Sequence, residues 1–340
     1  MSGQVLRVLT YHRVLDGSAA AGCNPSLVSA TPAGFKEQVR HLARRYRVVS
    51  GEEVVSAYRD GGRLPNRAVL ITFDDGYRDV GEVAWPILRR FGLPATVFVP
   101  TAFVDSSRRF WWDRLYHAIQ GTRAVSVDST FRGPLPLHDR ASRVSTLRVL
   151  QAHVKSLPHV EAVELVDCIV KALGSTGEPP PAVLGWDDLR ELSRDGMTLG
   201  AHTRTHPVLT RVPVEEARLE IRGCREDILR ETGSLPSIFA YPFGAHDADV
   251  MAAARSEGVA VAVTCLDGHN EVGRDDPVRL CRTNITPRTT LPVFRFRLSW
   301  IGPYVDRWRH GKGTDAAPPP DSRRPDGPRP RSEPASLLQE

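Results

Sequence analysis

The sequence predicts an α/β fold, built on a parallel sheet or on an α/β barrel. Short, continuously apolar segments such as 68–73 and 95–100 have the composition of strands buried on both faces. Segments with the spacing of amphipathic helices alternate with them, and this alternation is typical of parallel sheets and α/β barrels.

The first part of this pattern ends near residue 100. One helix is expected to begin after Thr31, a preferred capping residue that is followed by Pro32 at the first helical position. A second begins after Ser50, where Glu53 completes a capping box, and a third covers 79–91. The strands expected here are 4–11, 47–49, 68–73 and 95–100.

Between about residues 105 and 182 the pattern breaks, and the chain becomes more helical and polar. We expect an insertion on the barrel. The aromatic run 110–112 near its start has two interpretations: an anchor for the insertion, which we favour, or rings that stack on a sugar. Alternation then resumes, with helices expected at 186–195, 213–232 and 248–257 and strands at 197–200, 237–241 and 259–264.

The end of the chain departs from this pattern twice. Residues 294–300 alternate aromatic and basic side chains, which predicts an edge strand or docking arm, with contact to a membrane surface or glycolipid as the alternative. Residues 311–340 are rich in proline and low in complexity, which predicts a disordered tail. We therefore predict a single barrel domain over residues 1–310.

The composition fits a globular enzyme, with 41% hydrophobic and 25% charged residues, and excludes collagen, coiled coil and wholesale disorder. A net charge of +5 is too small to indicate nucleic acid, and no nucleic-acid partner is expected. Five widely spaced cysteines predict neither a disulfide framework nor a cysteine zinc site. No apolar run reaches the roughly 18 residues of a membrane span, and the first residues lack a leader pattern. These features predict a cytoplasmic protein, at most peripheral at the membrane, and leave its oligomeric state open.

Two acids and two histidines follow predicted strands. Asp74 and Asp75 come directly after strand 68–73, and the carboxyl ends of parallel strands are where α/β proteins build sites. His202 and His206 follow strand 197–200, and on a helical turn their imidazoles would project from one face. Two imidazoles and one carboxylate form a common ligand set for catalytic zinc, and a neighbouring carboxylate can serve as general base. An isolated Asp-Asp-Gly is more often a turn, so the combination carries the prediction.

A third segment, Phe239-Ala240-Tyr241-Pro242-Phe243-Gly244, ends a strand in a loop that could aim a backbone N–H at a developing oxyanion. Together with the opening Leu-Thr-Tyr-His-Arg-Val, the Thr-Phe-Asp-Asp-Gly motif and the His-Thr-x-x-His motif, it resembles the polysaccharide deacetylase family, the NodB-homology domain of carbohydrate esterase family 4. The resemblance covers about residues 4–105 and 183–290. It implies a distorted (β/α) barrel with fewer than eight complete units. It also implies metal-dependent hydrolysis of an N-acetyl, sometimes O-acetyl, group on a sugar.

The resemblance also implies roles for individual residues. Asp74 would be the general base, and the Phe243 N–H would help to stabilise the oxyanion. The metal ligands would be Asp75, His202 and His206. Residues Thr72 and Tyr77 would support the first loop.

This sequence departs from the family pattern at two places. Ala240 occupies the position where many members carry an arginine that orients the base, and Arg282, after the last predicted strand, is our candidate replacement. The late Leu-x-His segment that supplies the general acid in many members is not evident. Members that open with a Tyr-His-Arg strand resemble a permuted arrangement in which that first histidine takes the acid role. We therefore assign this role to His12, with His246 and His269 as alternatives.

These inferences predict a metal-dependent hydrolase that removes an N-acetyl group from an amino sugar in a polysaccharide, oligosaccharide or glycolipid precursor and releases acetate. One divalent ion is expected, zinc first, with cobalt, nickel or manganese also compatible with the ligands. The expected partner is an N-acetylated glycan or glycolipid. The alternatives are a deformylase or O-deacetylase on the same scaffold, or a non-catalytic glycan-binding protein.

Overall fold

The computed structural model describes residues 4–17, 22–174, 179 and 182–299. The predicted tail, 311–340, and the last residue of the segment 294–300 lie outside the described residues. Within them, seven parallel strands close into a ring, which confirms the predicted barrel with fewer than eight complete units. The ring runs in the order β1 (Gln4–Tyr11), β13 (Leu280–Asn284), β11 (Val261–Asp267), β10 (Ile238–Ala240), β9 (Thr198–Ala201), β6 (Thr96–Val99) and β5 (Ala68–Phe73).

The ring closes where β5 lies along β1, from the pair Leu6–Ala68 to the pair Tyr11–Phe73. On its other side, β5 pairs first with β4 (Arg47–Val49) and then, at Thr72 and Phe73, with β6. β12 (Asn270–Val272) pairs antiparallel with the start of β1. The two strands outside the ring, β12 and β4, therefore lie at the amino ends of β1 and β5. The carboxyl ends of the ring strands remain free to carry the site.

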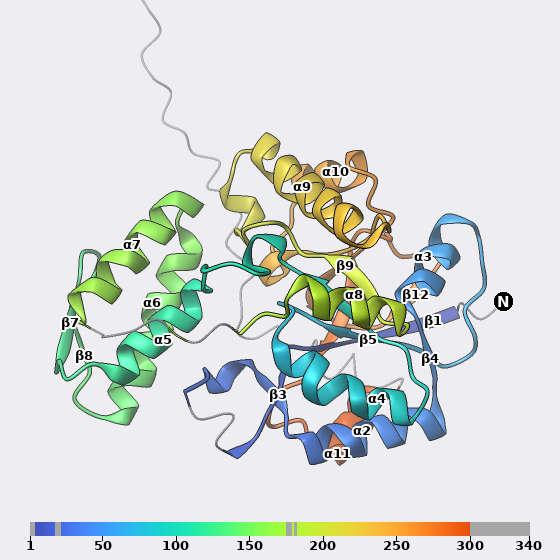
Figure 1. The fold of residues 1–340 in the computed structure, drawn as a ribbon, viewed down its shortest axis with the longest axis horizontal. Coiled ribbons are helices and arrows are strands. Elements are labelled where there is room, and N and C mark those ends of the chain that lie inside the picture. The colour runs from blue at the N-terminus through green and yellow to red at the C-terminus, as the bar shows by residue number, and fades with distance from the viewer. Residues whose placement is uncertain (1–3, 18–21, 175–178, 180–181, 300–340) are drawn as a thin grey trace, which may run out of the picture.

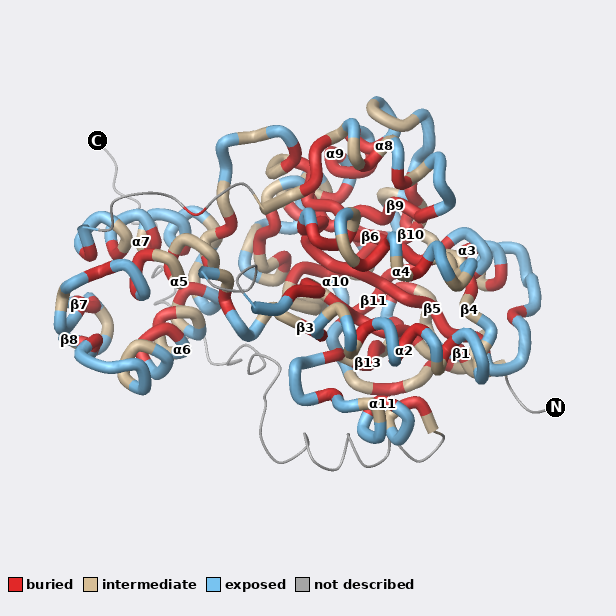
Figure 2. The backbone as a smooth tube through the Cα atoms, turned by 60° about the horizontal axis from the view of Figure 1, so that its bottom comes forward, coloured by how far each residue is buried: buried red, intermediate tan, exposed pale blue. Residues whose placement is uncertain are grey.

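Helices cover the outside of the ring, while the strands form the buried centre (Figures 1 and 2). Their starts follow the predicted caps: Thr31 accepts the Gly34 N–H at 3.1 Å, and Ser50 and Glu53 form the capping box. The barrel helices are α2 (Pro32–Arg45), α3 (Gly51–Arg59), α4 (Trp85–Arg90), α8 (Trp186–Arg194), α9 (Val214–Thr232), α10 (Ala248–Ser256) and α11 (Leu291–Arg297). Shorter elements are β2 (Arg13–Val14), β3 (Val28–Ala30) and 3-10 turns at Pro25–Leu27, Thr101–Phe103, Leu209–Arg211 and Pro242–Gly244.

Two predicted elements differ from the structure. The helix expected at 79–91 opens as a π-helical turn, Val80–Ala84, because Pro86 lacks an N–H and its ring crowds the preceding turn of an α-helix. The edge strand expected at 294–300 is wrong, because residues 294–297 form the last turn of α11. Phe294 and Leu298, four residues apart, are both fully buried, so their spacing places them on one helical face.

The chain between β6 and α8 forms a separate layer beside the barrel, at the left of Figure 1. It contains α5 (Trp111–Gly121), the hairpin of β7 (Ser126–Ser129) and β8 (Gly133–Pro136), α6 (Arg140–Ser156) and α7 (His159–Ala172). These elements bury an apolar cluster of their own, which includes Leu115, Leu150 and Val166. We refer to them as the insertion.

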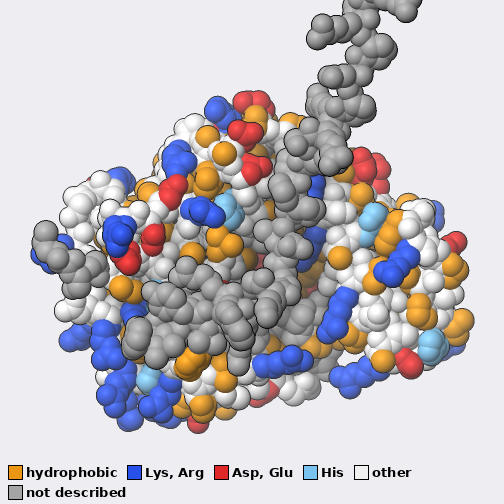
Figure 3. Space-filling view, turned by 180° about the vertical axis from the view of Figure 1, so that it is seen from behind, with side chains coloured by type: hydrophobic (Ala, Val, Ile, Leu, Met, Phe, Trp, Pro, Cys, Tyr) orange, Lys and Arg blue, Asp and Glu red, His pale blue; other side chains and the backbone are white. Residues whose placement is uncertain are grey.

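The surface carries charge of both signs. On the face in Figure 3, Lys and Arg side chains lie in several separate groups and not in one continuous stripe. In the described ranges, no helix has the length and apolarity needed to cross a bilayer. None of the five cysteines, all of which lie in the described ranges, forms a disulfide.

Candidate active site

The carboxyl ends of the ring strands bring the predicted site residues together. Asp74 and Asp75 follow β5, while His202 and His206 follow β9. His202 Nε2 lies 3.6 Å and His206 Nε2 lies 3.3 Å from Asp75 Oδ1, and the two Nε2 atoms are 3.1 Å apart. All three residues are buried. Sequence-distant residues thus present one carboxylate and two imidazole nitrogens to a common point.

The loop that carries the two histidines is not the helical turn that the spacing predicted. Thr203 and His206 take φ values of +64° and +58°, in the left-handed region that a right-handed helix excludes. The loop is fixed internally, because Thr203 Oγ1 accepts the His206 N–H at 3.0 Å. Asp75 and Phe243 also have positive φ, so strained backbone concentrates at this site, as it does at many functional sites.

This set of side chains fits a divalent cation. His202 Nδ1 lies 2.8 Å from the Ala240 carbonyl oxygen, which can only accept, so Nδ1 carries the proton and the Nε2 lone pair faces Asp75. Burial lowers the pKa of His206 and favours its neutral, ligand-competent form. Burial raises the pKa of Asp75, but the adjacent imidazoles of His202 and His206 outweigh it, so the net shift is downward. One anionic oxygen beside two neutral imidazoles is a donor set typical of catalytic zinc.

Asp74 is paired with Arg282. Both terminal nitrogens of the fully buried guanidinium lie 2.8 Å from the two Asp74 oxygens, and Arg282 Nε donates to the Thr264 carbonyl at 2.6 Å. Burial raises the pKa of Asp74, but the charge and the hydrogen bonds of Arg282 outweigh it, so the net shift is downward. Arg282, our candidate for the missing family arginine, thus forms two hydrogen bonds with the carboxylate of Asp74, the predicted base.

The other predicted residues lie around these two groups. His12 follows β1, and its backbone N–H donates to Ser29 Oγ at 2.9 Å. Phe243, in the loop after β10, packs its ring perpendicular to His206 with a centroid separation of 4.8 Å. The alternative acids are held by loop contacts: His246 Nδ1 lies 2.7 Å from the Gly244 carbonyl, and His269 Nε2 lies 3.3 Å from the Arg297 carbonyl.

The two expected supports of the first loop are both buried. Thr72 donates to the Leu9 carbonyl at 2.7 Å, which ties β5 to β1 directly before Asp74. Tyr77 accepts the Trp112 indole N–H at 2.9 Å and donates to Asp113 at 3.0 Å. The first loop is therefore held on one side by the barrel and on the other by the insertion.

Aromatic side chains of the insertion form one wall of the site. Trp112 packs edge-on to His206 at 4.8 Å, and Phe110 stacks on Trp112 at 4.4 Å. Phe110 and Trp112 are 2% and 5% exposed, which fits the anchor interpretation of this aromatic run. Trp111 is half-buried, 6.0 Å from Phe243. The anchor keeps solvent away from one side of the histidine pair.

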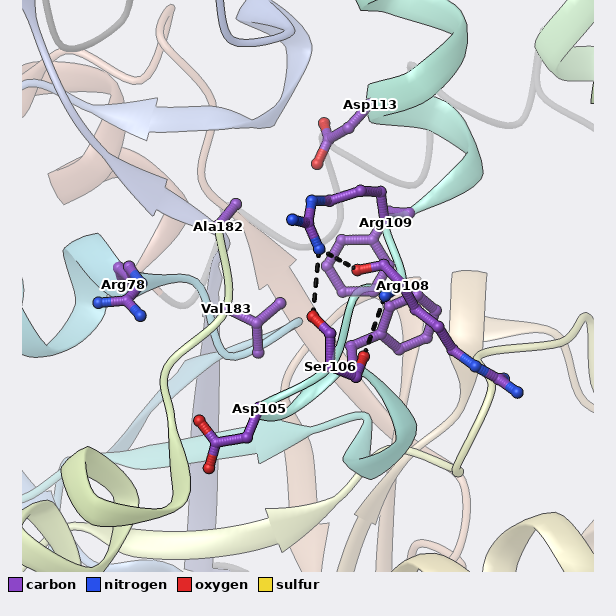
Figure 4. Close-up of a pocket in the computed structure, with 10 residues that line it drawn as sticks. Arg78, Asp105, Ser106, Arg108, Arg109, Asp113, Ala182 and Val183 are labelled. Atoms are coloured by element: carbon purple, nitrogen blue, oxygen red, sulfur yellow. Dashed lines mark hydrogen bonds between the residues drawn. The ribbon is translucent and has the colours of Figure 1, made fainter. Parts of the chain in front are cut away.

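Asp113 is a half-buried acid that the sequence did not single out. It accepts the Tyr77 hydroxyl and also lines a cavity of about 200 Å³ together with Arg78, Arg109 and Phe110 (Figure 4). Burial raises the pKa of Asp113 to about 6, more than the Tyr77 hydrogen bond and the charge of Arg13 offset. The folded protein therefore binds this proton more tightly than the unfolded chain, and stability falls as the pH rises from about 4 through 6.

We expect Asp113→Asn to stabilise the protein by about 1–2 kcal/mol at pH 7.5 and to change nothing at pH 4, because the amide cannot ionise but can still accept the Tyr77 hydroxyl. Urea unfolding at the two pH values measures this difference. Asp128→Asn, on the exposed side of β7, is the matched control and should show no pH-dependent effect. A gain of equal size at both pH values would contradict the assignment.

The fold and the site together define a class of protein: an α/β-barrel hydrolase with a candidate metal centre at its strand ends. Its family follows from sequence comparison. A model of the polysaccharide deacetylase family matches residues 61–262, more than half of the chain, and the chain belongs to that family.

Curated relatives match over shorter stretches. A poly-beta-1,6-N-acetyl-D-glucosamine N-deacetylase of Escherichia coli (strain K12) is 32% identical over 99 residues, which are 29% of this chain and 14% of the relative. An enzyme of the same name from Staphylococcus epidermidis is 32% identical over 80 residues, 23% of this chain and 27% of the relative. The chain thus spans well under half the length of these relatives.

Solved structures share the fold. A Streptococcus pyogenes deacetylase, PplD, in complex with acetate superposes with a TM-score of 0.61 at 18% identity, covering 88% of this chain and 100% of that one. IcaB from Ammonifex degensii gives a TM-score of 0.56 at 18% identity, covering 88% and 98%. At these identities the likeness concerns the fold alone.

Proposed function

We propose that the protein hydrolyses the N-acetyl group of an amino sugar within a glycan and releases acetate. The observation that carries the proposal is the position of the Asp74–Arg282 pair directly beside the Asp75–His202–His206 cluster, at the carboxyl end of a family barrel. Two of the relatives reported above are named for N-deacetylation of a poly-N-acetylglucosamine, which supports an N-acetylated glycan as the substrate class.

A divalent cation held by Asp75, His202 and His206 would supply Lewis acidity to the acetyl carbonyl and acidify water at this point. Zinc suits these donors, and cobalt, nickel and manganese are compatible with them. The cluster lies under the aromatic wall, so its electrostatic interactions are screened less than they would be in open solvent.

The chain's own residues have distinct tasks in this proposal. Asp74, ionised and held in one orientation by Arg282, accepts a proton from the attacking water. The Phe243 N–H donates to the acetyl oxygen as negative charge develops there. His12 donates a proton to the sugar nitrogen as the carbon–nitrogen bond breaks, so that acetate and a free amine leave.

A product assay over a panel of substrates tests the proposal. Oligomers of N-acetylglucosamine from one to six units should yield acetate and free amine in equal amounts. Formate from N-formylated sugars, or acetate without free amine from O-acetylated sugars, would assign the alternative hydrolase reactions. Glycan binding with no product from any substrate would instead identify a non-catalytic glycan-binding protein.

A further inference from the structure

Lys155 extends from the insertion to the candidate active site. It lies near the end of α6, and its Nζ stands 4.6 Å from the centroid of the Phe243 ring. The same ring packs perpendicular to His206, with a centroid separation of 4.8 Å. Lys155 of the insertion and His206, a candidate metal ligand of the barrel, therefore both contact the Phe243 ring.

The position of the insertion over the site is set by contacts on either side of Lys155. Trp112 packs on His206, as described above, and His159 Nε2 at the start of α7 lies 3.4 Å from Thr205 Oγ1 in the histidine loop. Because α6 and α7 also pack on one another in the cluster of the insertion, Lys155 is carried on a supported element and not on a free loop.

The ammonium group stands over an aromatic ring of the candidate site. Lys155 as a residue is exposed, yet burial around its amine lowers its pKa, an effect that Cys265 and the Asp75 carboxylate partly oppose. In the described part of the chain, no Asp or Glu forms an ion pair with it. A partly desolvated cation without a carboxylate partner interacts favourably with an anion that arrives with a ligand.

The other strong cation of the site cannot serve a ligand in the same way. Arg282 is fully buried and directs both of its terminal nitrogens to Asp74 and its Nε to the Thr264 carbonyl. Arg282 is therefore committed to Asp74 and to the backbone, whereas Lys155 stands over the Phe243 ring without a carboxylate partner among the described residues.

We propose that Lys155 forms a subsite for an anionic group, a carboxylate or a phosphate, carried by the glycan close to the acetamido group that is hydrolysed. This inference rests on the proposed deacetylase activity and adds a substrate class to it. The shared chemistry is a singly or doubly charged oxyanion, which a uronic acid in the chain or a sugar phosphate can provide. An ammonium contact with such a group is worth about 1.5–3 kcal/mol, or roughly 10- to 100-fold in affinity.

The test compares acetate release from three probes: a neutral N-acetylglucosamine tetramer, a tetramer that alternates N-acetylglucosamine with glucuronic acid, and N-acetylglucosamine 1-phosphate. The quantity measured is the ratio of kcat/KM for each anionic probe to that for the neutral probe. We expect wild type to favour at least one anionic probe, and the preferred probe identifies a carboxylate or a phosphate. Lys155→Gln should lower that ratio about tenfold, through KM, and Lys155→Arg should restore most of it.

Lys171→Gln is the matched control, since it removes the same charge near the far end of α7, about 18 Å along the helix from His159. It should leave the ratio unchanged. A wild-type ratio near one for both anionic probes, or a ratio that Lys155→Gln does not alter, would overturn the subsite while leaving the deacetylase proposal intact. Absence of acetate from all three probes, and from the wider substrate panel, would overturn both.

Discussion

Replacing Asp74 with asparagine is expected to reduce kcat for acetate release by about 10²–10⁴-fold, the usual contribution of a positioned general base. The amide has nearly the shape of the carboxylate and can still accept one Arg282 hydrogen bond, but it cannot take a proton from the attacking water. KM should change little, because the substitution leaves the aromatic wall and the Asp75–His202–His206 cluster in place.

Two measurements accompany this variant. The divalent metal content of Asp74→Asn should equal that of wild type, since Asp75 and the two histidines form the cluster. Its circular dichroism spectrum should also be unchanged. An Asp74→Asn protein that retains more than a third of the wild-type rate would remove Asp74 from the role of base.

The second large effect is expected from Arg282→Met, which should lower the free energy of unfolding by about 3–5 kcal/mol. The guanidinium is fully buried, and without it the Asp74 carboxylate remains in the interior with no compensating charge. Urea unfolding measures this loss. Arg274→Met is the matched control, because it removes an exposed arginine from an exposed ion pair and should have little effect.

A double-mutant cycle separates the pair from general damage to the core. Asp74→Asn combined with Arg282→Met removes both charges, so its destabilisation should be smaller than the sum of the two single effects by at least about 1 kcal/mol. Additive losses, within about 0.5 kcal/mol, would show that the two side chains do not stabilise one another.

Local patterns in the sequence were sufficient for most of the barrel. The run 68–73 is apolar except for Thr72, and strand β5 has those bounds. Thr31 and Ser50 predicted the starts of α2 and α3 because a cap depends on residues within one turn. Segment 294–300 misled for the same reason: alternation over a few residues resembles a strand, whereas burial of Phe294 and Leu298 against the barrel favours a helix.

The site depended on contacts that no local pattern contains. Asp74 and Arg282 are 208 residues apart, and only the family resemblance suggested that they might meet. The convergence of His202 and His206 depends on left-handed backbone within their loop, which residue spacing does not reveal. Lys155 is one of four lysines in the chain and belongs to no motif, so its position over Phe243 follows only from the packing of the insertion.

The central claim is that acetate release requires a divalent ion bound by Asp75, His202 and His206. The direct measurement is acetate release from N-acetylglucosamine oligomers by the full chain before chelation, after removal of all divalent metal, and after readdition of zinc or cobalt. We predict no acetate from metal-free protein and recovery of the initial rate when about one ion per chain is restored, as a single set of three ligands implies. Metal-free protein, verified by elemental analysis, that releases acetate at the initial rate would contradict the account.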